Sequence, residues 1–289
     1  MKKKLVSRIL ECLLLCMSFT CGARVSKGWR TFLGRDVDIS EVPFIVRLVT
    51  SDWGTCTGFI VAEDWIVTAA HCFESSQAAI VTMGSSSKFN SSIKIFSDEV
   101  IVHPEYYPGY RQYDIALIRL AQKIKENEVT KIINTEDKEW PRFVYNRACF
   151  VAGFGFHLFT EKDGILHGGE VHAGTGPYPY TCQFTYYENI IWTYRNISES
   201  LCYGDSGCPL ICDNVAVGVG ATSFTCGPQN YDINCGESFV DGYVSLYKLL
   251  PWLKSHISCL PTSCKSGAPR NMDYLLIMLI TTIQTFSYI

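Results

Sequence analysis

Three short segments of the chain carry side chains that together suit nucleophilic catalysis. His71 lies in Thr-Ala-Ala-His-Cys, Asp114 begins Asp-Ile-Ala-Leu, and Ser206 lies in Gly-Asp-Ser-Gly. A serine hydroxyl is a weak nucleophile at neutral pH, so it needs a neighbouring base such as an imidazole. The same imidazole can return the proton to a leaving group, while a carboxylate holds the ring in the required tautomer. The three side chains would therefore suit acyl transfer if the fold brought them together.

These segments, their order and nearly their spacing resemble the trypsin and chymotrypsin family of serine proteases, over about residues 31 to 256. The resemblance implies that His71, Asp114 and Ser206 form a catalytic triad. It also implies that the backbone N–H groups of Gly204 and Ser206 form the oxyanion hole, which stabilises charge on the reacting carbonyl oxygen. Any one segment alone would indicate only a structural histidine, a turn aspartate or a loop. Together they predict a serine endopeptidase that hydrolyses peptide bonds through an acyl-enzyme.

The resemblance also assigns a substrate pocket. The family carries its specificity-setting residue six positions before the nucleophile, and Ser200 stands there where trypsin-like enzymes have Asp. A neutral residue at this position predicts cleavage after apolar residues, because a buried unpaired cation is unfavourable. Thr225 in place of a family glycine would narrow the pocket to small or medium side chains. The pocket wall is matched to three consecutive residues, Ser223, Phe224 and Thr225.

Departures from the family pattern leave alternatives open. A second register of the pocket wall places Ala221 at the position assigned to Ser223, and a second pocket assignment puts the charge of Asp241 at the pocket floor. Cys208 stands where the family has glycine, two residues after the nucleophile. A side chain there would strain the oxyanion loop. This departure favours an alternative interpretation, in which the protein is a catalytically impaired homologue that acts as a binding or regulatory module.

The family resemblance implies that the protein is made as a zymogen. In the family, cleavage frees an apolar N-terminus that pairs with the aspartate before the nucleophile, here Asp205. Counting back from Cys56 and Pro43 places the cut between Arg30 and Thr31, with Gly34 matching a family glycine. A cut between Arg24 and Val25 is the alternative, because valine is a more typical first residue but lies about six residues too early.

The chain contains 14 cysteines, which predicts an oxidising compartment and disulfide bonds. The family resemblance implies the pairs Cys56–Cys72, Cys149–Cys212 and Cys202–Cys226. Spacing does not assign the remaining cysteines of the mature chain, which are Cys182, Cys208, Cys235, Cys259 and Cys264. A disulfide-rich surface protein without protease ancestry is the second alternative.

Short strands must position these residues. Residues 44–49, 58–61, 65–67, 115–120 and 215–224 are apolar runs bounded by Gly, Pro, Asn and Asp, which is typical of an all-β domain. Helical pattern is convincing only near residues 249–254. The resemblance makes the fold more specific: a trypsin-like double six-stranded antiparallel β-barrel with a short C-terminal helix.

Both ends of the chain carry processing patterns. Residues 1–23, basic and then mostly apolar, predict a signal peptide, with an uncleaved signal anchor as the alternative. A short propeptide at 24–30 and the peptidase domain at 31–257 follow. Residues 258–289 are a polar stalk and an uncharged tail that resembles a GPI-attachment signal. In the alternative the tail stays attached as an apolar anchor or packs on the domain.

The protein is therefore expected outside the cell, secreted or tethered to the outer face of the plasma membrane. Consensus glycosylation sites at Asn90 and Asn196 agree with export. The net charge of −3 gives no indication of a nucleic-acid partner. We expect protein or peptide substrates, an activating protease and protein inhibitors as partners, and neither a cofactor nor a metal.

Overall fold

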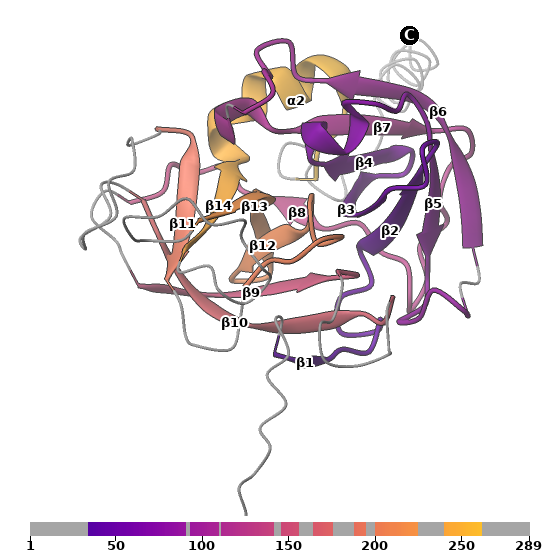
Figure 1. Cartoon of the computed structure of the whole chain (residues 1–289), viewed down its shortest axis with the longest axis horizontal. Coiled ribbons are helices and arrows are strands. Elements are labelled where there is room, and N and C mark those ends of the chain that lie inside the picture. Colours follow the sequence, from indigo (N-terminus) through magenta and orange to yellow (C-terminus); the bar gives the residue numbers. More distant parts are fainter. Residues whose placement is uncertain are drawn as a thin grey trace, which may run out of the picture. The chain divides into compact units, whose positions relative to one another are not determined.

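The computed structural model describes residues 34–90, 93–109, 111–141, 146–155, 164–175, 188–194, 200–224 and 240–261. Figure 1 shows this part of the chain as strands with short helical turns and one α-helix. The predicted signal peptide, the propeptide, the apolar tail and Asn196 lie outside the described residues. So do Thr31, Thr225 and Cys226.

Six antiparallel strands close a first barrel in the order β2-β3-β4-β7-β6-β5. The turn between the strands β3 and β4 lies at Glu63 and Asp64, between the predicted apolar runs 58–61 and 65–67. The six strands are β2 (Ile45–Thr50), β3 (Thr55–Ala62), β4 (Trp65–Thr68), β5 (Ala79–Met83), β6 (Ile93–Val102) and β7 (Ala116–Leu120).

Six further strands form a second ring, which the antiparallel pairings of β9 with both β10 and β12 close. Two short strands extend it: β1 (Arg35–Asp36) pairs with β10, and β8 (Asn134–Thr135) runs parallel to β13. The ring consists of β9 (Arg147–Gly153), β10 (His167–Gly174), β11 (Ile190–Tyr194), β12 (Pro209–Cys212), β13 (Val215–Phe224) and β14 (Val240–Ser245).

In the described part of the chain, four helical elements connect or end these strands. The three short turns are η1 (Ala70–Phe73), η2 (Arg111–Tyr113) and η3 (Tyr247–Leu249), and the C-terminal helix is α2 (Leu250–His256). Pro251 lies in the first turn of α2, where its missing N–H leaves no hydrogen bond unmade. The predicted double six-stranded barrel with a short C-terminal helix is thus confirmed.

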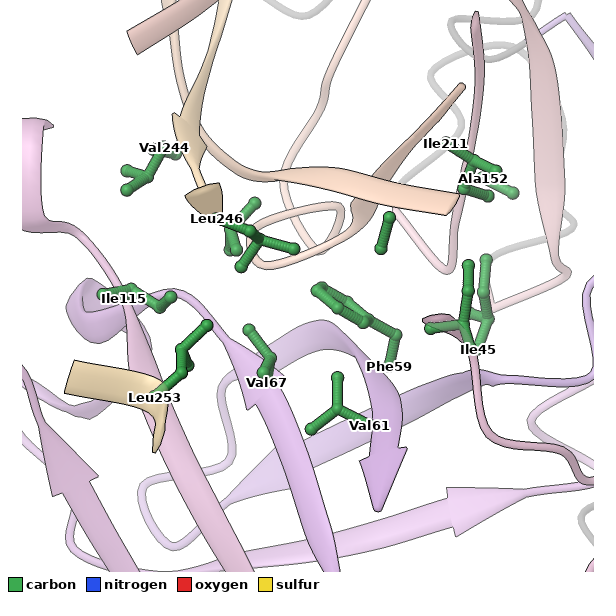
Figure 2. Close-up of a cluster of buried hydrophobic side chains, with 14 of the residues drawn as sticks. Ile45, Phe59, Val61, Val67, Ile115, Ala152, Ile211, Val244, Leu246 and Leu253 are labelled. Atoms are coloured by element: carbon green, nitrogen blue, oxygen red, sulfur yellow. The ribbon is translucent and has the colours of Figure 1, made fainter. Parts of the chain in front are cut away.

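Successive residues of β3 face two different cores, because side chains of a strand alternate between its faces. Phe59 and Val61 belong to a buried cluster shared by both barrels, and Ile60 between them packs inside the first barrel. Figure 2 shows the shared cluster, in which Phe59 and Val67 of the first barrel face Leu246 and Ile211 of the second. Burial of each large apolar side chain contributes about 2 kcal/mol, so this cluster fixes one barrel against the other.

Candidate active site

The three residues predicted to form the triad come from three different elements. His71 lies in η1 directly after β4, Asp114 follows η2, and Ser206 lies in the loop before β12. His71 Nδ1 is 2.7 Å from Asp114 Oδ2, and His71 Nε2 is 2.7 Å from Ser206 Oγ. The fold therefore joins the three side chains in one hydrogen-bonded chain, although His71 and Ser206 lie 135 residues apart in the sequence.

The carboxylate of Asp114 is held by several donors in a fully buried position. Its Oδ1 accepts a hydrogen bond from the backbone N–H of His71 at 2.9 Å. Its Oδ2 faces both the His71 ring and the guanidinium of Arg111, whose Nη1 lies at 3.2 Å. The His71 side chain is 23% exposed, so the imidazole lies between a buried acid and an open hydroxyl. This arrangement fixes the ring orientation needed for general base chemistry.

Two glycines allow the backbone of the nucleophile loop to turn. Gly204 has φ of 96° and Gly207 has φ of 85°, in the left-handed region that other residues rarely adopt. A Cβ on Gly207 would lie 2.1 Å from Thr68 Oγ1 and 2.3 Å from the carbonyl oxygen of Thr57. Gly204 is the residue predicted to donate one N–H to the oxyanion. Its carbonyl oxygen accepts a hydrogen bond from the hydroxyl of Thr57, which fixes its backbone.

Thr57 is a residue that sequence reasoning missed. It lies in β3 and is completely buried. Its hydroxyl donates to the carbonyl oxygen of Gly204 at 2.8 Å and accepts from the N–H of Phe154 at 3.0 Å. Its N–H donates to the carbonyl oxygen of Ser206 at 2.9 Å. The first barrel thus holds the loop of the second, and the only sequence signal was a threonine in an apolar run beside Cys56.

Asp205, the residue expected to pair with a new N-terminus, is buried beside the nucleophile. Its Oδ1 accepts from the N–H of Gly155 at 2.8 Å, and its Oδ2 accepts from the N–H of Cys202 at 3.0 Å. Burial raises the pKa of Asp205 to about 7, although these two hydrogen bonds oppose the shift. The expected partner, the amino group of Thr31, lies outside the described residues.

Two of the predicted pocket residues meet at a third carboxylate. Ser200 Oγ lies 3.3 Å from Asp241 Oδ1, and Ser223 Oγ donates to the same oxygen at 2.6 Å. The N–H of Leu201 donates to Asp241 Oδ2 at 3.1 Å. Asp241 is only 4% exposed, and Ser223 faces it directly in the pairing of β13 with β14. The side chain of Phe224 and the whole of Thr225 lie outside the part of the chain that the structure describes.

Cys208 is a free thiol and is completely buried. It packs in the core of the second barrel, where a Cβ on Gly220 would lie 2.9 Å from its sulfur. Burial raises the pKa of the thiol, so it stays protonated near neutral pH. Because the thiol is free, the bridge between Cys182 and Cys208, one of the pairings that the sequence left open, is not formed.

Disulfide bonds tie both halves of the site. Cys56–Cys72 joins β3 to η1, and Cys149–Cys212 joins β9 to β12, as the family resemblance implied. Cys202 is also disulfide-bonded, and its expected partner Cys226 lies outside the described residues. Cross-links of this kind each stabilise a fold by about 2 to 4 kcal/mol. The Cys56–Cys72 bond also limits how far the turn that carries His71 can move.

No group of three or more His, Cys, Asp or Glu among the described residues is arranged to hold a metal ion. No helix in the described part of the chain is long and apolar enough to cross a membrane.

Several known proteins are similar to this chain in sequence. Transmembrane protease serine 9 of Rattus norvegicus is 27% identical over 84% of this chain, and complement factor I of Mus musculus is 27% identical over 84%. The chain spans only 24% and 42% of the lengths of these two relatives. A trypsin of Simulium vittatum is 30% identical over 72% of this chain and 88% of its own length.

Solved structures agree in fold. A structure titled HL collagenase covers 78% of this chain and 98% of its own, with a TM-score of 0.65 at 20% identity. Neuropsin, a serine protease expressed in the limbic system of mouse brain, covers 77% and 98%, with a TM-score of 0.62 at 23% identity. The family model described as trypsin matches residues 32–253. The chain therefore belongs to the trypsin family of serine proteases.

Proposed function

We propose that this protein is a secreted or cell-surface serine endopeptidase that hydrolyses peptide bonds through an acyl-enzyme intermediate. The observation that carries the proposal is the unbroken chain of 2.7 Å hydrogen bonds from Ser206 through His71 to Asp114. A chain of this kind pairs a nucleophile with a base and the base with an orienting acid. The alternative is an impaired homologue that acts as a binding or regulatory module.

The proposed reaction uses each group in turn. Ser206 Oγ transfers its proton to His71 Nε2 and attacks the carbonyl carbon, while N–H groups of Gly204 and Ser206 stabilise the oxyanion. The C–N bond then breaks as His71 gives that proton to the leaving amine, which leaves an ester on Ser206. Water repeats both steps with the ester carbonyl, releases the acid product and restores the hydroxyl. Asp114 stabilises the imidazolium in both halves.

Active-site labelling tests this proposal directly. The recombinant protein, before and after cleavage by an activating protease, is treated with a fluorophosphonate and analysed by mass spectrometry. Labelling at Ser206 that is absent from Ser206→Ala, with a fall in kcat of about 10⁴ or more in that variant, supports the endopeptidase. A cleaved, folded wild-type protein that takes up no label would instead establish the impaired homologue.

We further propose that the pocket prefers apolar side chains of small to medium size before the scissile bond. Ser200 brings no charge to the pocket. The carboxylate of Asp241 already accepts hydrogen bonds from Ser200, Leu201 and Ser223 and is 4% exposed. A carboxylate that is buried and hydrogen-bonded in this way is a weaker partner for a substrate cation than an open one.

Asp241 is also the observation that favours the second candidate, cleavage after Arg or Lys. Matched peptides with Ala, Leu, Phe or Arg before the scissile bond separate the two. A preference for Leu or Ala supports the apolar pocket. A tenfold preference for Arg, about 1.4 kcal/mol in transition-state binding, would show that Asp241 receives the cation. Asp241→Asn should then abolish that preference.

Activation is proposed to occur by cleavage between Arg30 and Thr31, followed by pairing of the new amino group with Asp205. The buried, raised-pKa carboxylate of Asp205 supports this proposal, because a cation beside it would stabilise its charged form. N-terminal sequencing of the active enzyme tests the site: a start at Val25 moves the cut, and activity of uncleaved protein refutes the mechanism.

Export and membrane attachment remain part of the same proposal. Asn90, a proposed glycosylation site, is exposed after β5, as an acceptor must be. We expect protein substrates, an activating protease and protein inhibitors outside the cell. Release of the enzyme from cells by a phosphatidylinositol-specific phospholipase, without residues 274–289, would support the GPI anchor. Full-length protein free in the medium would refute both modes of attachment.

A further inference from the structure

Arg111 forms a direct ion pair with the buried acid of the triad. Its Nη1 lies 3.2 Å from Asp114 Oδ2, the oxygen that also faces His71 Nδ1 at 2.7 Å. The Asp114 side chain is completely buried, while that of Arg111 is 31% exposed. A permanent positive charge therefore contacts the same carboxylate oxygen as the catalytic imidazole.

The local backbone produces this contact. Arg111 begins η2 and Asp114 follows its last residue, with the N–H of Asp114 donating to the carbonyl oxygen of Arg111 at 3.4 Å. Side chains three residues apart eclipse one another in a 3₁₀ turn. The turn thus places the guanidinium over the carboxylate. The sequence Arg-Gln-Tyr-Asp alone gave no such indication, because it does not specify a 3₁₀ turn.

The charge of Asp114 explains why this contact matters. While His71 is neutral, as a general base must be, the imidazole offers the buried carboxylate a hydrogen bond but no countercharge. We propose that Arg111 is a positioning residue of the triad, which supplies a countercharge to Asp114 and fixes its carboxylate in the resting enzyme. This inference rests on the proposed endopeptidase function.

Two tyrosines and three glutamates interact with one another close to this ion pair. Tyr106 donates a hydrogen bond to Glu74, one residue beyond the η1 turn that carries His71. Burial, that hydrogen bond and the charge of Asp114 raise the pKa of Tyr106, while the charge of Arg111 lowers it. On the η2 turn itself, Tyr113 interacts with Glu105 and Glu188. The raised pKa of Tyr106 means that its hydroxyl stays neutral near pH 7.

Three substitutions separate the charge of Arg111 from its hydrogen bond. Arg111→Gln keeps an N–H donor without charge, Arg111→Lys keeps the charge, and Arg111→Ala removes both. Loss of the positive charge makes protonation of His71 easier, and protonated His71 cannot accept the proton of Ser206. The acid limb of the kcat/KM profile should therefore move to higher pH, by about half a unit, in the Gln and Ala variants only.

The loss of kcat should depend instead on whether residue 111 still donates a hydrogen bond to Asp114. Arg111→Ala should lower kcat about tenfold with KM unchanged within about twofold, while Arg111→Gln should lose less. Arg119→Gln is the matched control, because Arg119 pairs with Asp98 at 2.6 Å on the barrel exterior and is 46% exposed. Its kcat and pH profile should equal those of the wild type.

Two kinetic results would overturn the assignment. One is a wild-type kcat and acid limb in both Arg111→Gln and Arg111→Ala. The other is an effect on KM alone that is larger for acidic peptides, which would mean that Arg111 contacts substrate.

An NMR readout keeps this inference separate from the proposed activity. The proton between His71 Nδ1 and Asp114 should give a downfield resonance, which Arg111→Gln should displace and Arg119→Gln should not. If Ser206 is never labelled but this resonance moves, the endopeptidase proposal fails and the positioning role stands. If Ser206 is labelled and the resonance stays unchanged, the positioning role fails.

Discussion

Two buried carboxylates lie beside His71 and Ser206, and the two barrels stabilise them differently. Asp114 of the first barrel contacts a guanidinium and an imidazole, at 3.2 and 2.7 Å. The hydrogen bonds described for Asp205 of the second barrel come from backbone N–H groups of Gly155 and Cys202. Dipoles stabilise a buried charge less than a cation does, and the pKa of Asp205 is raised to about 7.

This difference indicates that the two sides of the candidate active site are held in place in different ways. The His71 and Asp114 side is fixed by a 16-residue disulfide loop and by local hydrogen bonds. The loop of Ser206 depends on contacts that cross between the barrels, above all those of Thr57. We therefore expect substitutions to disturb the His71 and Asp114 side less than the loop of Ser206.

Gly207→Ala should have the largest effect on the nucleophile loop. Gly207 has φ of 85°, and its Cβ would approach Thr68 Oγ1 to 2.1 Å. Strain and overpacking together should lower the free energy of unfolding by about 4 kcal/mol and abolish labelling of Ser206.

Gly109→Ala is the matched control, because Gly109 has φ of 87° with nothing within 4 Å of a Cβ. It should lose only about 1 to 2 kcal/mol. If chemical denaturation shows that both variants lose the same unfolding free energy, the close contacts around Gly207 do not determine the conformation of the nucleophile loop.

The raised pKa of Asp205 should make stability depend on pH. Its pKa rises from 3.8 to about 7 on folding, so the folded protein binds the extra proton, and the contribution of this group to stability is fully present only below about pH 4. Stability should fall as pH rises from 4 to 7, by up to about 4 kcal/mol for this group.

Guanidinium unfolding of the uncleaved protein at several pH values measures this slope, and Asp205→Asn should flatten it. Pairing with a new N-terminus should flatten it as well, so the activated enzyme is the second comparison. A slope that survives Asp205→Asn would assign the pH dependence to other groups.

Thr57→Val tests the contact between barrels with a smaller expected effect. The substitution leaves the carbonyl of Gly204 and the N–H of Phe154 without the hydroxyl that contacts both. Unfolding free energy should fall by about 2 kcal/mol, and kcat should fall with it. Thr57→Ser, which keeps the hydroxyl, should retain most of the activity. If this variant loses as much activity as Thr57→Val, the lost packing of the methyl group, and not the lost hydrogen bonds, explains the decrease.

Cys208→Ala should have the smallest effect. Loss of the buried sulfur beside Gly220 leaves a small cavity, which lowers stability by about 1 kcal/mol. Peptide hydrolysis should stay within about twofold of wild type. A large gain in activity would instead mean that the thiol strains the oxyanion loop. Thiol titration of the native protein should find Cys208 unreactive until unfolding.

The sequence determined much of this picture. The segments around His71, Asp114 and Ser206 identified the family, and the short apolar runs predicted strands near their observed places. These features are local: residue type and spacing decide which side chains a loop presents and which face of a strand is buried.

Only the tertiary structure decided which distant groups meet outside the triad and the disulfide bonds that the resemblance implied. Thr57 reaches Gly204, and Ser223 faces Asp241, because barrel closure and strand register set those distances. Arg111 lies over Asp114 because a 3₁₀ turn forms there. Cys208 points into the second core rather than into a bridge. None of these contacts follows from a motif, since each depends on how separate segments pack and which buried polar groups they leave to be paired.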